Sequence, residues 1–162
     1  MRNLSEEEFD KKYQIYKPII YSIAYTYVKN QNDADDIMQD VFVKYLKSDV
    51  VFNDDNHEKY WLIRVTINTA KNFVSSTWKK RVVLDDDYVS RAFDETSKES
   101  NRYFEVITSL PSKYKDVITL YYYEDLSVEE IANTLQVSIS CVKKRLERGR
   151  EKIKKEIENG RL

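Results

Sequence analysis

The sequence predicts an all-α protein made of two small helical domains. Apolar residues recur at three- and four-residue steps along most of the chain, a spacing that places them on one face of a helix. Only two Gly and two Pro occur among 162 residues, and charged residues make up 34%, which favours long helices over sheets and turns. We therefore expect an N-terminal domain over residues 1–81, an acidic linker over 82–100 and a C-terminal helix-turn-helix domain over 101–162.

The first helical stretch begins with Ser5 followed by Glu8, a pair that predicts a capping box at a helix start. Apolar and aromatic residues follow at helical spacing from Phe9 to Tyr27. Pro18 lies inside this pattern and is expected to kink or restart the helix, because proline removes one backbone hydrogen bond and clashes with the preceding turn.

The next helix is predicted over residues 33–47, with a regular apolar stripe. Its other face is acidic and amide-bearing, and offers Asp36, Gln39, Asp40 and Val43. Carboxylates near a helix N-terminus are favoured by the helix dipole, so this face fits ordinary capping and solvation. It fits equally well a docking surface for another protein, and periodicity alone does not choose between the two.

Residues 48–56 are predicted to form a loop, and residues 58–80 a long helix with two distinct faces. One face is apolar. The other contains no acid and carries bases, amides and indole rings: Arg64, Asn68, Lys71, Asn72, Ser75, Trp78 and Lys79, with Trp61 at its edge. These side chains suit contacts with phosphates, base edges or unstacked bases. The alternative is an ordinary amphipathic helix with its Trp half buried.

The stretch from 82 to 100 carries six acids against two bases and is predicted to be a tether between the domains. Fully extended at roughly 3.3–3.6 Å per residue, such a tether could span on the order of 65 Å. That reach would connect DNA sites about one and a half to two helical turns apart.

Beyond the linker, Pro111 is predicted as a first-turn residue of a helix that runs to Tyr123. The stretch from 126 to 155 then predicts two helices joined by a tight turn. Ser127 with Glu130 forms a capping box for the first, and Ser138 caps the second only three residues after the first ends. Gln136 occupies the turn position that commonly carries Gly, which requires a left-handed backbone.

The second of these helices has an apolar face and a basic face. Val142, Leu146, Gly149 and Ile153 share one side, while Ser140, Lys144, Arg148 and Glu151 share the other. Residues 138–155 contain eight Lys or Arg and two Glu, a local net charge of +6 in a chain whose overall charge is −1. A basic face on the second helix of such a motif is typical of DNA reading, and the alternative is a solvated surface helix of a bundle.

The remaining composition excludes several classes of protein. Cys141 is the single cysteine, so no intramolecular disulfide forms and a reducing, cytoplasmic location is expected. No apolar run approaches the roughly 20 residues of a membrane span, and the acidic N-terminus is unlike a signal peptide. His57 is the only histidine, and neither a phosphate loop nor a metal cluster is visible, so we expect no cofactor, no metal and no catalysis by this chain.

With these motifs in this order, the sequence resembles the extracytoplasmic-function group of bacterial sigma factors. The segment DADDIMQDVFVKYL resembles the core-polymerase-binding helix of that family, and YWLIRVTINTAKNFV resembles its downstream-promoter helix. The segment LPSKYKDVITLYYYEDLSVEEIANTLQVSISCVKKRLERGREKI is similar to its C-terminal domain.

The resemblance implies core RNA polymerase and promoter DNA as partners, and an anti-sigma factor as a further one. It assigns polymerase docking to Asp33, Asp36, Gln39, Asp40 and Phe42, the last as support from inside. It assigns the minus-thirty-five element to Ser140, Lys143, Lys144, Glu147 and Arg148. It assigns the minus-ten element to Phe52, Asn53, Trp61, Arg64, Asn68, Lys71, Asn72 and Lys79, with the loop over 51–54 accepting a flipped base.

The main alternative is a stand-alone helix-turn-helix regulator that binds operator DNA without polymerase. A separate acidic helix and two separate candidate DNA faces argue against it.

Overall fold

The computed structural model describes residues 2–81 and 98–160, and the side chains of residues 2–76 and 102–160. In these ranges every regular element is an α-helix, which confirms the predicted all-α class. The chain divides into two compact units, Met1–Ala92 and Phe93–Leu162. The predicted linker falls mostly outside the described residues, and the first helix of the second unit begins at Lys98, inside the range predicted as linker.

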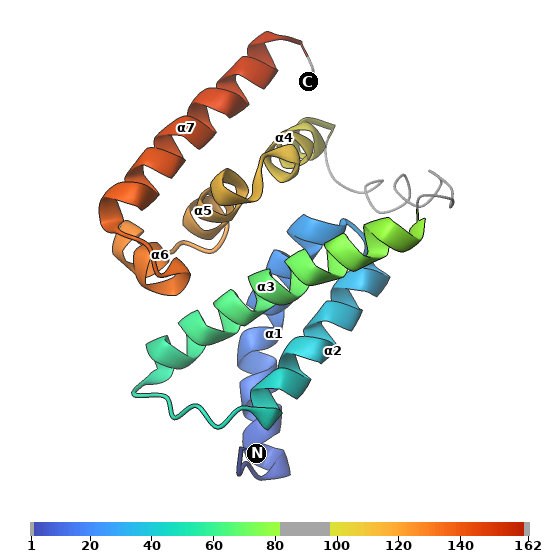
Figure 1. Ribbon diagram of the computed structural model, residues 1–162, viewed down its shortest axis with the longest axis vertical. Helices are drawn as coiled ribbons and strands as arrows, with labels where there is room; N and C mark the ends of the chain where they lie inside the picture. Colours follow the sequence, from blue (N-terminus) through green and yellow to red (C-terminus); the bar gives the residue numbers. More distant parts are fainter. Residues whose placement is uncertain (1, 82–97, 161–162) are drawn as a thin grey trace. The chain divides into compact units, whose positions relative to one another are not determined.

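The described part of the first unit is built from α1 (Glu6–Val28), α2 (Gln31–Lys47) and α3 (Asp55–Arg81), each packed on the other two (Figure 1). The hydroxyl of Ser5 caps α1 by accepting a hydrogen bond from the amide of Glu8 at 3.1 Å. Lys29 closes α1 with a left-handed backbone (φ 57°), and Asn30 caps α2. This two-residue connection makes α1 and α2 a tight helical hairpin.

Pro18 does not end or restart α1, which runs through it as one helix of 23 residues. Of the two predicted effects, a kink or a restart, the structure excludes the restart. The physical reason is burial on both sides of the proline, since Tyr16 and Ile20 are 6% and 0% exposed. Burying such side chains stabilises the helix by roughly 1.5–3 kcal/mol each, which offsets the cost of about 3 kcal/mol of an internal proline.

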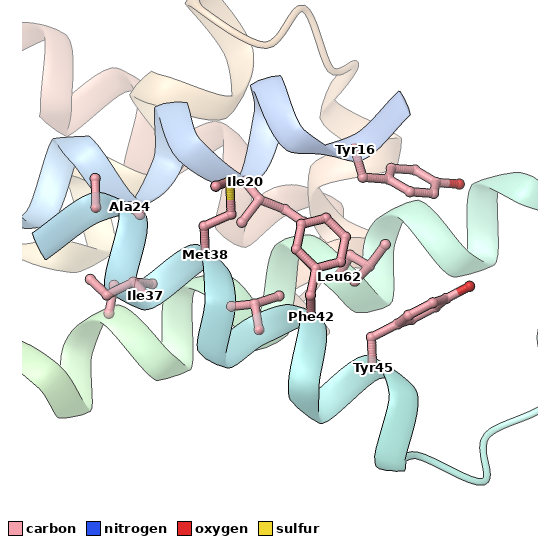
Figure 2. Packing of buried hydrophobic residues seen from close by; sticks show 11 residues of the cluster. Tyr16, Ile20, Ala24, Ile37, Met38, Phe42, Tyr45 and Leu62 are labelled. Carbon is pink, nitrogen blue, oxygen red and sulfur yellow. The ribbon is translucent and has the colours of Figure 1, made fainter. Parts of the chain in front are cut away.

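The core of the first unit collects apolar side chains from its three described helices (Figure 2). Ile20 of α1, Ile37 of α2 and Leu62 of α3 are all at most 1% exposed. At one end of this cluster Tyr16 and Tyr45 point their hydroxyl groups the same way (Figure 2). The apolar core is continued there by a polar group that both tyrosines share, the carboxylate of Glu58.

The described part of the second unit contains α4 (Lys98–Ser109), α5 (Ser112–Tyr122), α6 (Val128–Leu135) and α7 (Ile139–Glu158). Its core buries Val117 and Ile118 of α5, Ile131 of α6, and Val142 of α7. Pro111 is the N-cap of α5 (φ −52°, ψ 144°) and not a first-turn residue, so that prediction is off by one position. No helix in the described ranges is both long enough and apolar enough to cross a bilayer.

Candidate nucleic-acid interface

The helix-turn-helix is formed by α6, a short turn and α7. Ser127 and Glu130 make the predicted capping box: the Ser127 hydroxyl accepts from the Glu130 amide at 3.1 Å. The Glu130 carboxylate in turn accepts from the Ser127 amide at 3.1 Å. Two amides that the first helical turn leaves unpaired are satisfied in this way, which fixes the start of α6.

The turn between α6 and α7 has the left-handed residue that its sequence position predicts. Gln136 has φ 58° and ψ 47°, and its amide donates to the carbonyl of Ala132. The amide of Val137 donates to the same carbonyl at 3.1 Å. The hydroxyl of Ser138 then caps α7 by accepting from the amide of Cys141 at 3.1 Å. This arrangement redirects the chain within three residues.

The apolar face of α7 packs into the second unit as predicted. Val142 and Leu146 are 0% and 2% exposed, and Gly149 is buried. A Cβ atom on Gly149 would lie 3.0 Å from Cγ1 of Ile118, so glycine permits the close approach of α7 to α5. Because this face is fixed against α5 and α6, the opposite face of α7 has a fixed orientation within the unit.

That opposite face carries the residues predicted to read the minus-thirty-five element. All five are exposed to solvent: Ser140, Lys143, Lys144, Glu147 and Arg148. Three cations on neighbouring turns give it a positive potential in this part of the chain.

A cavity of about 320 Å³, here called the α7 cavity, lies beside this face. It is lined by Lys113 and Tyr114 of α5 together with Ser138, Ser140, Cys141, Lys144, Arg145 and Arg148. Burial raises the pKa of Tyr114, but the positive charges of Lys113 and Arg148 outweigh that effect and lower it overall. The four cations in the lining make this surface suited to anions such as phosphate. The sequence did not single out Lys113, because only the packing of α5 on α7 brings it to this surface, whereas Arg145 was counted only as one of the bases of residues 138–155.

In the first unit, α3 presents the second candidate surface. Asn68, Lys71 and Asn72 are exposed, whereas Trp61 and Arg64 are half-buried. The side chain of Lys79 lies outside the described residues. The exposed amides and the Lys71 cation follow each other along one side of the helix, as predicted.

Next to the N-terminus of α3, the loop over residues 48–54 borders a second cavity, here called the loop cavity. Its volume is about 440 Å³, and it is lined by Arg2, Asn3, Lys12, Ser48, Asp49, Val50, Val51, Phe52, Asp54, Asp55 and Glu58. Val51, Phe52 and Asp54 belong to the stretch predicted to accept a flipped base. Asn53 is exposed and is not among the lining residues. A cavity of this size holds a planar ring system with room for its edges to be contacted.

The N-terminus of α3 is anchored next to this cavity by Asp54 and His57. The Asp54 carboxylate accepts a hydrogen bond from the amide of His57 at 2.7 Å. Nδ1 of His57 accepts one from the amide of Asn53 at 3.1 Å. The only histidine in the sequence therefore has a structural role in the loop.

A buried carboxylate forms part of the wall of the loop cavity. Glu58 is 5% exposed and accepts hydrogen bonds from Lys12, Tyr16 and Tyr45, each at 2.8 Å. Burial raises the pKa of the Glu58 carboxyl, but these three hydrogen bonds and the Lys12 charge lower it overall. The pKa values of Tyr16 and Tyr45 are raised well above their usual range by burial and by the bond to Glu58. This Glu58 network ties α1, α2 and α3 together at the cavity.

The residues predicted for polymerase docking divide into two sets in the structure. Asp36, Gln39 and Asp40 are exposed on α2, and Asp40 lies 3.6 Å from Lys44 one turn on. Asp33 is 8% exposed, and its carboxylate accepts a hydrogen bond from the side-chain amide of Asn30 at 2.9 Å, so it takes part in capping α2. Phe42 is 4% exposed and packs against the rings of Phe9 and Tyr13, and therefore lies inside the first unit. The surface available to a partner is the exposed set alone.

No group of three or more His, Cys, Asp or Glu in the described ranges is placed to hold a metal ion. The exposed side chains of the two candidate surfaces include cations and amides.

Two family models match the chain. The one described as "Sigma-70 region 2" matches residues 13–80, which include α2, α3 and much of the loop cavity's lining. The one described as "Sigma-70, region 4" matches residues 100–153, which include the helix-turn-helix.

Curated relatives give a consistent result. The chain is 34% identical to RNA polymerase sigma factor SigV of Bacillus subtilis over 135 residues, covering 82% of this chain and 81% of that protein. It is 28% identical to the ECF RNA polymerase sigma factor SigW of the same organism, covering 94% and 90%. It is also 28% identical to the ECF RNA polymerase sigma-E factor of Escherichia coli, covering 88% and 83%.

Solved structures show a similar fold at lower identity. One is the sigma factor RpoE in complex with the anti-sigma factor NepR from Bartonella quintana, with a TM-score of 0.69, 19% identity, and coverage of 94% of this chain and 98% of that one. Another is CnrH in complex with the cytosolic domain of CnrY, with a TM-score of 0.71, 20% identity, and coverage of 96% and 90%.

Proposed function

Since the chain belongs to the extracytoplasmic-function group of RNA polymerase sigma factors, we propose that it directs core polymerase to promoters by recognising both a minus-ten and a minus-thirty-five element. The family is regulatory and not catalytic, and implies promoter-specific initiation with RNA polymerase. The observation that carries the proposal is the exposed basic face of α7, held in a fixed orientation by the buried packing of Val142, Leu146 and Gly149.

The minus-thirty-five element would be bound by the exposed basic face of α7. A helix placed in the major groove by a helix-turn-helix presents its exposed side chains to base edges, and Lys144 and Arg148 lie on that side. Arg148 can form two parallel hydrogen bonds with a guanine, whereas a lysine acts more as a point charge on phosphate. Lys113 and Arg145, which line the α7 cavity, would add contacts to the DNA backbone.

The minus-ten element would be bound by α3 and the loop cavity. Proteins that take a base out of the stack hold it in a close-fitting pocket and read its edge with polar groups. The loop cavity offers the ring of Phe52 and the carboxylate of Asp54 for these two purposes. Asn68, Lys71 and Asn72 of α3 would hold the strand that leads to the flipped base.

Core polymerase would dock on the exposed residues of α2, namely Asp36, Gln39 and Asp40. Two residues would support this surface without contacting polymerase: Asp33 fixes the start of α2, and Phe42 packs α2 on α1. Two of the similar structures are complexes, one of a sigma factor with an anti-sigma factor and one of CnrH with CnrY. These complexes support an anti-sigma factor as an additional partner of this chain.

Sequencing the 5′ ends of transcripts tests the proposal. Purified core polymerase transcribes fragmented genomic DNA with and without this protein, and the new 5′ ends are aligned. A recurrent pair of upstream elements at constant spacing is the expected result. New 5′ ends without a shared element pair, or none at all, would contradict it. A stand-alone operator-binding regulator, the main alternative, would give no new starts with core polymerase alone.

A further inference from the structure

Arg2 joins the N-terminal segment to the end of α2 through two hydrogen bonds and to the loop over residues 48–54 through a third. Its backbone amide donates to the carbonyl of Leu46 at 2.7 Å. Its side-chain Nε donates to the carbonyl of Tyr45 at 3.2 Å, and Nη2 donates to the carbonyl of Val50 at 2.9 Å. One residue therefore holds both the end of α2 and the middle of the loop.

The guanidinium of Arg2 also lies against two aromatic rings. Its Cζ atom is 4.6 Å from the ring centroids of both Tyr45 and Phe52. Those rings are nearly parallel, at 8°, with centroids 6.3 Å apart. Phe52 in turn contacts Trp61 of α3 at 5.6 Å between centroids. A cation facing the rings is attracted by their quadrupoles, so Arg2 fixes the side chain of Phe52 as well as the loop backbone.

The same residue lines the loop cavity, together with Val50 and Phe52, which it holds. The loop over residues 48–54 has no regular structure, and such a loop loses conformational freedom when it closes around a ligand. Contacts that hold the loop before the ligand arrives reduce that loss. Arg2 supplies such contacts to Val50, 48 positions away in the sequence, and to the ring of Phe52.

We infer that Arg2 is a positioning residue for the minus-ten site: it holds the 48–54 loop and Phe52 in the conformation that receives a nucleobase. This inference rests on the proposed function of the loop cavity. The planar guanidinium makes two hydrogen bonds in different directions and faces two rings at once. A lysine at this position keeps the charge but lacks the fork geometry, so Arg2→Lys is expected to restore only part of the effect.

The test compares Arg2→Ala, Arg2→Lys and a matched control, Lys11→Ala, which removes an exposed cation from α1. Each variant is assembled with core polymerase. Two affinities are measured: for a single-stranded oligonucleotide carrying the minus-ten element found by transcript sequencing, and for a duplex carrying the minus-thirty-five element. We expect Arg2→Ala to weaken the affinity for the minus-ten oligonucleotide by about tenfold and to leave the affinity for the minus-thirty-five duplex unchanged. A tenfold loss is equivalent to the cost of ordering one or two side chains. Lys11→Ala leaves both unchanged.

A spectroscopic readout reports on the loop itself. Trp61 and Trp78 are the two tryptophans of the chain, so a Trp78→Phe background leaves Trp61 as the reporter of the ring contact with Phe52. Arg2→Ala is expected to increase quenching of Trp61 emission by acrylamide, with unchanged far-ultraviolet circular dichroism. Equal minus-ten affinity in wild type and Arg2→Ala would overturn the role of Arg2 and leave the proposed function standing. An equal loss of affinity for both elements in Arg2→Ala would have the same consequence. Failure of the wild-type holoenzyme to bind the minus-ten oligonucleotide would overturn the proposed function, and the inference with it.

Discussion

The carboxylate of Glu58 accepts a hydrogen bond from the hydroxyl of Tyr45 at 2.8 Å, and the two residues are only 5% and 1% exposed. They come from α3 and α2, on either side of the loop over residues 48–54. Glu58 also accepts from Tyr16 and forms an ion pair with Lys12 at 2.8 Å. A buried charge with three partners thus joins the three described helices of the first unit next to the loop cavity.

Removing Glu58 is expected to destabilise the first unit strongly. Glu58→Ala leaves Lys12, Tyr16 and Tyr45 without their shared acceptor, and loss of one partner of a buried ion pair costs about 3–5 kcal/mol. The loss of unfolding free energy should lie near the low end of this range, because the Lys12 side chain is 29% exposed and water can replace part of the interaction. Denaturant unfolding measures this loss. Tyr45→Phe, which keeps the ring, is the matched control and should cost about 1 kcal/mol.

A double-mutant cycle separates the hydrogen bond from general damage. If Glu58 and Tyr45 interact as described, Glu58→Ala with Tyr45→Phe should cost less than the sum of the single changes, by about 0.5–3 kcal/mol. Strict additivity would contradict the shared network.

The same network predicts a loss of stability at both ends of the pH range. The pKa of Glu58 is lowered in the folded state, so its contribution is fully present above its unfolded pKa of about 4.3 and is lost as pH falls through the folded value. The pKa values of Tyr16 and Tyr45 are raised, so their contribution is present below about 10 and is lost as pH rises above that value.

The melting temperature measured from about pH 3 to about pH 11 covers the onset of both losses, because each loss begins at the unfolded pKa. Glu58→Gln should flatten the acid slope, because it removes the group that titrates. An acid slope identical to that of wild type would show that other carboxylates produce it.

Replacing Gln136 with glycine is expected to stabilise the second unit. Gln136 has a left-handed backbone at φ 58°, which costs a residue with a Cβ about 1 kcal/mol and costs glycine almost nothing. Thermal unfolding should therefore show a gain of about 1 kcal/mol for Gln136→Gly. Asn133→Gly, in the body of α6, is the control and should destabilise the unit, because glycine is unfavourable inside a helix. A loss of stability in both variants, or a gain in both, would contradict the turn geometry.

Arg148 and Lys144 are expected to differ in how they contribute to minus-thirty-five binding. Arg148→Ala should cost about 1–3 kcal/mol and relax sequence preference at one position, if its guanidinium reads a base. Lys144→Ala should weaken binding to all sequences alike and reduce the slope of log affinity against log salt by about one. Lys154→Ala, exposed near the end of α7, is the control. Affinities at several salt concentrations and on single-base variants of the site distinguish these outcomes, and unchanged footprints for Arg148→Ala would count against its role.

Charge reversal on α2 should remove polymerase binding without unfolding the protein. Asp36 and Asp40 are exposed, and the Asp40–Lys44 ion pair has both side chains about half exposed, so its loss costs little. Asp36→Arg with Asp40→Arg is therefore expected to keep the wild-type melting temperature and to abolish co-purification with core polymerase. Asp10→Arg, on an exposed position of α1, is the control. Normal co-purification of the double variant would refute the assignment of this surface.

The parts of the fold that the sequence predicts well are those decided by local interactions. The Ser127–Glu130 capping box, the left-handed Gln136 and the buried stripe of α7 all follow from residues within a few helical turns of each other. The restart considered at Pro18 does not occur for the opposite reason, because packing of α1 on two other helices outweighs a local cost.

The parts of the candidate site that the sequence misses are made by contacts between distant residues. Arg2 reaches residues 43 and 48 positions away, and Lys12 reaches Glu58 over 46 positions. No local pattern encodes such distances. One signal was available: Glu58 lies one helical turn before the buried Leu62, on the apolar side of α3, and an acid in an apolar stripe indicates a buried partner. Asp33 is a different case, because its partner Asn30 is only three positions away and the contact is local.

Run-off transcription with purified core polymerase and this protein, on three versions of one promoter, shows whether the chain directs initiation through both elements. The first template carries both elements, the second has its minus-ten element replaced, and the third has its minus-thirty-five element replaced. We expect a run-off product of defined length from the first template and a large loss of product from each of the other two. The absence of product from the intact template, or equal product from all three, would refute a sigma factor that reads both elements.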